Sequence, residues 1–113
     1  MVTGDEDSKF GVKAEGVPPL VTHIVEECPH LEFKGLMAMG KVGDVAGFRE
    51  MVKLKQALLP DLITRKLMRD SSDFELSMGT SQDYELAVAE GATEVRLGTT
   101  IFGARDYKYS KPN

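Results

Sequence analysis

The sequence predicts an α/β fold in which a parallel sheet is built from strands that alternate with helices. Apolar residues recur at helical spacing in three stretches, and the stretches between them are alternating or continuously apolar. Glycine or proline separates most of these stretches. Strands that alternate with helices form βα units with parallel strands. Three or four such strands are few for a complete domain, so we expect the 113 residues to form one partial domain, half of a (β/α)8 barrel.

The chain is expected to begin with a loop over residues 1–17, which are polar and interrupted by glycines, with the end of a strand allowed at residues 1–3. Pro18 and Pro19 favour the start of a helix. The apolar stripe from Leu20 to Cys28 has helical spacing, and Pro29 stops it.

The next pair of elements is a strand and a long helix. Residues 31–39 begin with alternation and become continuously apolar, which is typical of a strand buried on both faces. Asp44 is expected to cap a helix whose apolar stripe begins at Val45. Pro60 is expected to kink or break this helix.

The last third of the chain repeats the pattern. Residues 74–78 alternate and predict a strand ending at Gly79. Ser81 is expected to cap a helix over residues 82–90, with Gly91 at its end. Residues 94–98 predict a further strand, and residues 108–113 a polar tail.

Composition excludes several classes of protein. With 14 Lys and Arg against 18 Asp and Glu, the net charge is −4, which argues against nucleic-acid binding. No apolar stretch approaches the roughly 20 residues that cross a bilayer, and the acidic N-terminus is unlike a signal peptide. Cys28 is the single cysteine, so we expect neither an intrachain disulfide nor a metal site, and a cytoplasmic location.

Two strand ends are candidates for a ligand site, because ligands of βα folds bind at the carboxyl ends of the strands. At the first, Gly79 and Ser81 lead into a helix N-terminus, which favours an anion such as phosphate. The alternative is an ordinary helix cap in which Thr80 and Asp83 form a capping box.

The second candidate strand end carries Arg96, Gly98 and Thr99. If Val95 faces the helices, alternation places Arg96 on the opposite face of the sheet. A partly buried arginine there contacts either a ligand or a carboxylate, and Glu75 is the candidate carboxylate.

The stretches 74–83 and 95–107 resemble the C-terminal signature of the pyridoxal phosphate homeostasis family, also called the proline synthetase co-transcribed homologues. That family is similar to the N-terminal barrel of alanine racemase. Residues 28–37 and 6–11 match further stretches of the family in the same order.

The resemblance implies a barrel that binds pyridoxal 5′-phosphate and acts in vitamin B6 homeostasis as a non-catalytic carrier. By motif match, the phosphate is held by Ser81, Gly98 and Thr99, and Arg96 faces the pyridine nitrogen. Met78 and Gly79 line the same pocket. The family lysine that forms a Schiff base lies on the first barrel strand, whereas this chain begins about where the fifth strand ends.

The lysine and the first four βα units are therefore expected to be absent, and Thr80 stands where the family commonly has methionine. Two alternatives stay open. The chain is a fragment of a fold-type III racemase or decarboxylase, or it is a remnant that binds no cofactor. The expected partners are the cofactor and either the missing half-barrel or a second copy that joins through open strand edges.

Overall fold

The computed structural model describes residues 1–2 and 11–104, and its central element is a parallel sheet. In these residues the sheet has three strands in the order β1 (Gly35–Met37), β2 (Glu75–Thr80) and β3 (Glu94–Arg96). Both neighbouring pairs are parallel. The predicted α/β class with a parallel sheet is confirmed.

Val2 adds the end of a further strand beside β1. Its N–H donates to the carbonyl of Met37 at 2.7 Å, and its carbonyl accepts from the N–H of Met39 at 3.1 Å. The bridge between Val2 and Ala38 is parallel. Of the strand end allowed at residues 1–3, the described residues show isolated bridges at Val2, and residue 3 lies outside the described part of the chain, as do residues 6–10 and the predicted tail.

Helix α1 and the start of α2 lie where local signals place them, whereas the end of α2 does not. Helix α1 (Val17–Glu27) has proline in its first turn and ends just before Cys28. Helix α2 (Val45–Thr64) is capped by Asp44, whose carboxylate accepts from the N–H of Gly47 at 3.0 Å. The break expected at Pro60 is wrong, because α2 continues through it to Thr64.

The remaining helical segments are short. Helix α3 (Tyr84–Glu90) ends at Gly91, which has a φ of 117° and satisfies the expected helix end. Helix α4 (Thr99–Phe102) follows β3. Single 3-10 turns lie at Ala14–Gly16 and Ser71–Asp73, the first of them inside the expected N-terminal loop.

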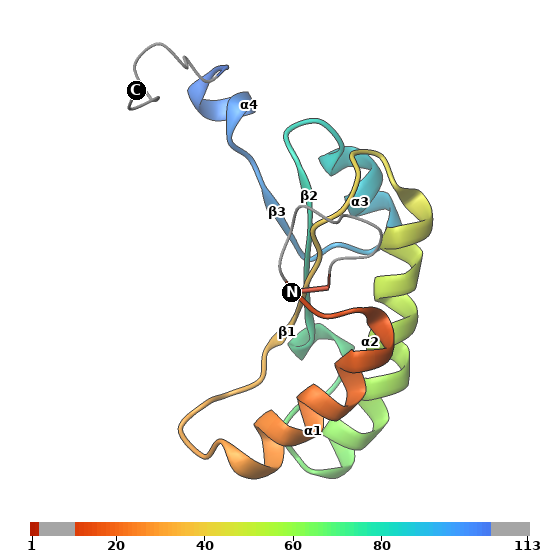
Figure 1. Cartoon of the computed structure of the whole chain (residues 1–113), viewed down its shortest axis with the longest axis vertical. Coiled ribbons are helices and arrows are strands. Elements are labelled where there is room, and N and C mark those ends of the chain that lie inside the picture. Colours follow the sequence, from red (N-terminus) through yellow and green to blue (C-terminus); the bar gives the residue numbers. More distant parts are fainter. Residues whose placement is uncertain (3–10, 105–113) are drawn as a thin grey trace.

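Helices α1, α2 and α3 lie on one side of the sheet, while α4 extends away from it (Figure 1). The core between sheet and helices contains Leu76 and Met78 of β2, which are 1% and 0% exposed. The residues that alternate with them, Glu75 and Ser77, are exposed and half-buried. One face of the sheet is therefore buried, and the described chain leaves the other face open.

The prediction of a strand buried on both faces over residues 31–39 is wrong. Strand β1 covers only Gly35–Met37, and Leu31 is 63% exposed. Its neighbour β2 begins at Glu75, opposite Gly35, so residues 31–34 have no adjacent strand among the described residues. Strand length is set here by the partner and not by the apolar pattern.

Candidate functional site

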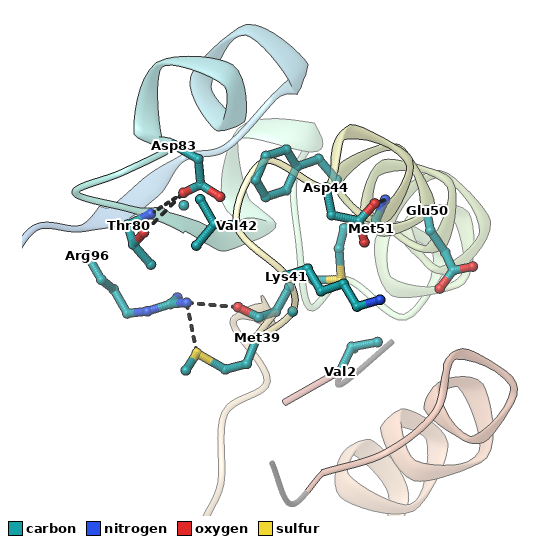
Figure 2. A pocket seen from close by; sticks show the side chains of 15 residues that line it. Val2, Met39, Lys41, Val42, Asp44, Glu50, Met51, Thr80, Asp83 and Arg96 are labelled. Carbon is teal, nitrogen blue, oxygen red and sulfur yellow. Dashed lines mark hydrogen bonds between the residues drawn. The ribbon is translucent and has the colours of Figure 1, made fainter. Parts of the chain in front are cut away.

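The candidate site lies at the carboxyl ends of the parallel strands, where a cavity opens between the sheet and the start of α2 (Figure 2). Its volume is about 80 Å³, against roughly 300–1,000 Å³ for sites that enclose a small molecule. The cavity is therefore too small to enclose a small molecule by itself and forms only part of a site. It is lined by Val2, Ala38, Met39, Gly40, Lys41, Val42, Asp44, Gly47, Phe48, Glu50, Met51, Gly79, Thr80, Asp83 and Arg96.

Arg96 lies on the open face of the sheet, as alternation predicts, and its guanidinium is held by neighbouring strands. Nη1 donates to the hydroxyl of Ser77 at 2.7 Å and to the Ser77 carbonyl at 3.1 Å. Nη2 donates to the carbonyl of Ala38 at 2.8 Å and lies 3.1 Å from the sulfur of Met39. Figure 2 shows the side chain directed across the sheet toward Met39.

The alternative that pairs Arg96 with Glu75 is wrong, because the described ion pairs do not join these residues and the guanidinium donates to Ser77 and Ala38 instead. A hydrogen bond to Glu75 and the charge of that residue raise the pKa of the Glu94 carboxyl, and Arg96 opposes the shift. Sequence analysis did not assign Ser77 a role. Strand alternation could have identified Ser77, because its position between Leu76 and Met78 places it on the same face of the sheet as Arg96.

Ser81 joins the two strand ends that the sequence singled out. Its hydroxyl oxygen accepts from the N–H of Gly98 at 2.9 Å and from the N–H of Thr100 at 3.0 Å. The expectation that Ser81 caps a helix over residues 82–90 is wrong, since α3 begins at Tyr84 after Asp83. Ser81, Gly98 and the first residue of α4, Thr99, therefore lie together, beside the cavity and not within its lining.

Met78 and Gly79 have different surroundings. The side chain of Met78 is 0% exposed in the core, so only its backbone can reach a ligand. Gly79 lines the cavity and has a φ of +100°, and a Cβ there would lie 2.6 Å from the Cβ of Ala87. Glycine is required at this position by backbone conformation and by the close packing of α3.

Asp83 is a site residue that sequence analysis considered only as part of a capping box. Its carboxylate accepts from the N–H of Thr80 at 2.7 Å, which is one half of the expected box, and from the N–H of Gly43 at 2.8 Å. Burial raises the pKa of Asp83, but the hydrogen bonds from Gly43 and Thr80 outweigh burial and hold the pKa below its usual value. The contact with Gly43 spans 40 positions, so no local pattern could have found it.

The described residues contain neither a membrane-spanning helix nor a cluster of metal-ligating side chains. No helix in residues 1–2 and 11–104 is long and apolar enough to cross a membrane. In the same part of the chain, no group of three or more His, Cys, Asp or Glu side chains is arranged to hold a metal ion.

Comparison with known sequences confirms the resemblance to the pyridoxal phosphate homeostasis proteins. The chain is 42% identical over 118 positions to the protein of that name from Bos taurus, a match that covers 97% of this chain and 41% of the relative. The Haemophilus influenzae protein of that name is 39% identical over 107 residues, covering 95% and 44%. The chain thus spans about two fifths of the length of these relatives. A scan against protein-family models finds no match.

Two solved structures match the chain over most of its length. PipY of Synechococcus elongatus, solved with pyridoxal phosphate bound, matches with a TM-score of 0.61 and 25% identity over 90% of this chain and 47% of PipY. A protein of unknown function from Bifidobacterium adolescentis matches with a TM-score of 0.64 and 33% identity over 89% of this chain and 40% of that protein.

Proposed function

We propose that this chain, a homologue of the pyridoxal phosphate homeostasis proteins, binds pyridoxal 5′-phosphate as half of a (β/α)8 barrel and serves B6-vitamer homeostasis in the cytoplasm. The observation that carries the proposal is the contact of Ser81 with Gly98 and Thr100. It places a hydroxyl and two backbone N–H groups, from strand ends 17 or more positions apart, within one hydrogen-bonded cluster.

The cluster fits a phosphate. Backbone N–H groups at strand ends and a serine hydroxyl are the donors that proteins use for phosphate dianions. At present the N–H groups of Gly98 and Thr100 share the single oxygen of Ser81. A phosphate oxygen offers a stronger, charged acceptor to the same N–H groups. Ser81, Gly98 and Thr99 are therefore proposed as the residues that hold the phosphate, with Gly79 and the backbone of Met78 beside them.

Arg96 fits the ring nitrogen. Its Nη atoms are held by Ser77 and Ala38, which fixes the plane of the guanidinium on the open face of the sheet. A guanidinium is always protonated and only donates, so it accepts no proton from the ring and favours an unprotonated ring nitrogen. The cofactor supplies an aldehyde and an electron-withdrawing ring when bound, and an unprotonated ring withdraws electrons less. That preference suits holding the cofactor better than turning over a substrate.

We propose a carrier role and not an enzymatic one. The motif match assigns no lysine of this sequence to a Schiff base, and the cavity of about 80 Å³ is small for a site that encloses a cofactor. A second copy, or a separate half-barrel, is the proposed partner for the open edges of the sheet. The alternative is a fragment of a fold-type III racemase or decarboxylase.

Equilibrium dialysis of the chain against pyridoxal 5′-phosphate tests the proposal. We expect a dissociation constant on the order of 0.1–1 mM, or roughly 4–5.5 kcal/mol. Pyridoxal, which lacks the phosphate, is expected to bind too weakly to detect. Ser81→Ala combined with Thr99→Ala weakens binding by about 0.5–1.5 kcal/mol per lost hydrogen bond, whereas Thr64→Ala, at the far end of α2, serves as the control.

Arg96→Ala is the complementary variant. We expect it to change the absorbance of the bound cofactor more than its affinity, because the lost group faces the ring and not the phosphate. Equal retention of pyridoxal and its phosphate, or full retention by all variants, would show that both strand ends are structural caps. The remnant reading is then the correct one.

A further inference from the structure

Asp83 is the charged residue that the described chain buries most completely, and its carboxylate contacts Gly43 and Thr80, near the carboxyl ends of two neighbouring strands. The residue is 7% exposed. Its carboxylate accepts from the N–H of Gly43 at 2.8 Å, from the N–H of Thr80 at 2.7 Å and from the Thr80 hydroxyl at 3.2 Å. A buried carboxylate is stable only when hydrogen bonds replace those that it made with water. The contacts from Gly43 and Thr80 together supply this replacement.

These contacts tie two strand ends together. Gly43 belongs to the loop between β1 and α2, and Thr80 is the last residue of β2. Figure 2 shows the carboxylate of Asp83 directed toward Thr80, above the loop that carries Val42. The carboxylate therefore fixes the loop over the cavity to the end of the neighbouring strand.

The connection continues to the third strand end. Ser81 follows Thr80 directly, and its hydroxyl accepts from the N–H groups of Gly98 and Thr100 after β3. If Thr80 shifts, Ser81 shifts with it and loses its alignment with these two N–H groups. Asp83 thus lies within a series of contacts that joins the loop after β1, the end of β2 and the residues after β3, in which Thr80 and Ser81 are linked by the chain itself.

We propose that Asp83 is a positioning residue, which sets the placement of Ser81 and, through it, of the Gly98 and Thr100 N–H groups. One part of the inference rests on the proposed function: the expectation that a bound phosphate is held less well without Asp83. Its structural content is independent of any ligand. Asp83 does not line the Ser81 cluster as a phosphate donor, since a carboxylate accepts and repels a dianion.

Asp83→Asn tests the proposal with little change in size. The amide retains one acceptor oxygen, and its NH₂ group then faces one of the two backbone N–H groups that the carboxylate satisfied. Asp73→Asn is the matched control. Asp73 also accepts a backbone N–H, from Arg69 at 2.8 Å, together with the Arg69 side chain, but it precedes the amino end of β2, whereas Asp83 follows the carboxyl end.

Amide hydrogen exchange, followed residue by residue by NMR, is the measurement. In Asp83→Asn we expect exchange at Gly98 and Thr100 to rise about tenfold, although neither contacts Asp83. Exchange at Leu76, whose N–H donates to the Thr93 hydroxyl at 2.8 Å within the sheet, is expected to stay as in the parent. Asp73→Asn leaves Gly98 and Thr100 unchanged.

Two outcomes overturn the inference. Faster exchange at Gly43 and Thr80 with no change at Gly98 and Thr100 shows that Asp83 secures its own turn only. An equal rise at Leu76 shows a general loss of stability. If Asp83→Asn does not fold, Thr80→Val is the substitute, which removes the 3.2 Å contact with Asp83 together with the 3.4 Å contact from the Gln82 N–H. It is expected to raise exchange at Gly98 and Thr100 about twofold to threefold, and an unchanged rate contradicts the proposal.

Dialysis against pyridoxal 5′-phosphate separates this inference from the proposed function. We expect Asp83→Asn to weaken binding about tenfold and Asp73→Asn to leave it unchanged. A parent chain that binds no cofactor refutes the proposed function but leaves the exchange result standing. A parent that binds, with Asp83→Asn binding equally well, refutes the role of Asp83 in holding the phosphate.

Discussion

Replacing Gly79 by alanine is expected to be among the most damaging small substitutions in this chain. The residue has a φ of +100°, and an added Cβ would lie 2.6 Å from the Cβ of Ala87 and 3.3 Å from the Cα of Tyr84. A strained backbone conformation costs about 1–3 kcal/mol. Forcing a methyl group into a packed contact costs about 1–3 kcal/mol more.

One effect opposes these costs. Alanine restricts the unfolded chain more than glycine does, which stabilises the fold by about 0.4–1 kcal/mol. The net loss is therefore about 1–5.5 kcal/mol, against a total stability of roughly 5–15 kcal/mol for a single domain. With a urea dependence of about 2 kcal/mol per molar, the midpoint of unfolding is expected to fall by about 0.5–3 M.

Urea unfolding followed by circular dichroism measures this change, and two further variants test its cause. Gly98→Ala is the control, because an added Cβ there meets no atom within 4 Å and φ is −108°. Its midpoint is expected to stay close to that of the parent.

Ala87→Gly separates steric contact from backbone strain. It costs about 1 kcal/mol alone, as glycine does within a helix. Combined with Gly79→Ala it removes the 2.6 Å contact, so the double variant is expected to recover about 1–2 kcal/mol relative to additivity. A Gly79→Ala protein as stable as the parent, or a strictly additive double variant, refutes the reasoning.

Three further predictions concern acid stability, covalent binding and assembly. Folding lowers the pKa of Asp83, so the stability that its carboxylate contributes is present above the unfolded pKa near 4 and is lost as the pH falls below that value. The difference in free energy of unfolding between the parent and Asp83→Asn, measured with urea, is therefore expected to shrink below about pH 4. A difference that stays constant with pH contradicts this. Borohydride reduction with pyridoxal 5′-phosphate, read by peptide mass mapping, is expected to label no single lysine to completion, because the motif match assigns no lysine of these 113 residues to the Schiff base; complete labelling of Lys41, which is exposed at the cavity, would overturn that. Analytical ultracentrifugation is expected to show concentration-dependent association through the open edges of the sheet, and a monomer at every concentration argues against the half-barrel.

Local patterns were sufficient for the order of elements and for most helix ends. Asp44, Pro18 and Gly91 act within one helical turn of their own positions, so their roles are readable from neighbouring residues. Alternation along β2 likewise predicted a buried face, because side chains of a strand point to opposite sides whatever lies beside it. The same rule placed Arg96 on the open face.

Helix continuity and strand length were decided by tertiary structure. Helix α2 continues through Pro60 while packing against the sheet, although proline removes one backbone donor. Residues 31–34 carry a pattern typical of a strand, but a strand forms only where a neighbour offers hydrogen bonds, and β2 begins at Glu75. An apolar pattern indicates which side chains of a segment can be buried. It does not indicate which faces of the segment other elements will cover.

By itself, the sequence determined the fold class and the strand ends at which a ligand site was expected. Only the tertiary structure decided how the residues at those strand ends are used. Ser81 serves Gly98 and Thr100 and not its own helix, and Asp83 reaches Gly43 across 40 positions. The physical reason is that a side-chain hydroxyl or carboxylate binds whichever donor the folded chain brings within about 3 Å, and that neighbour is set by how parallel strands assemble, not by any spacing along the chain.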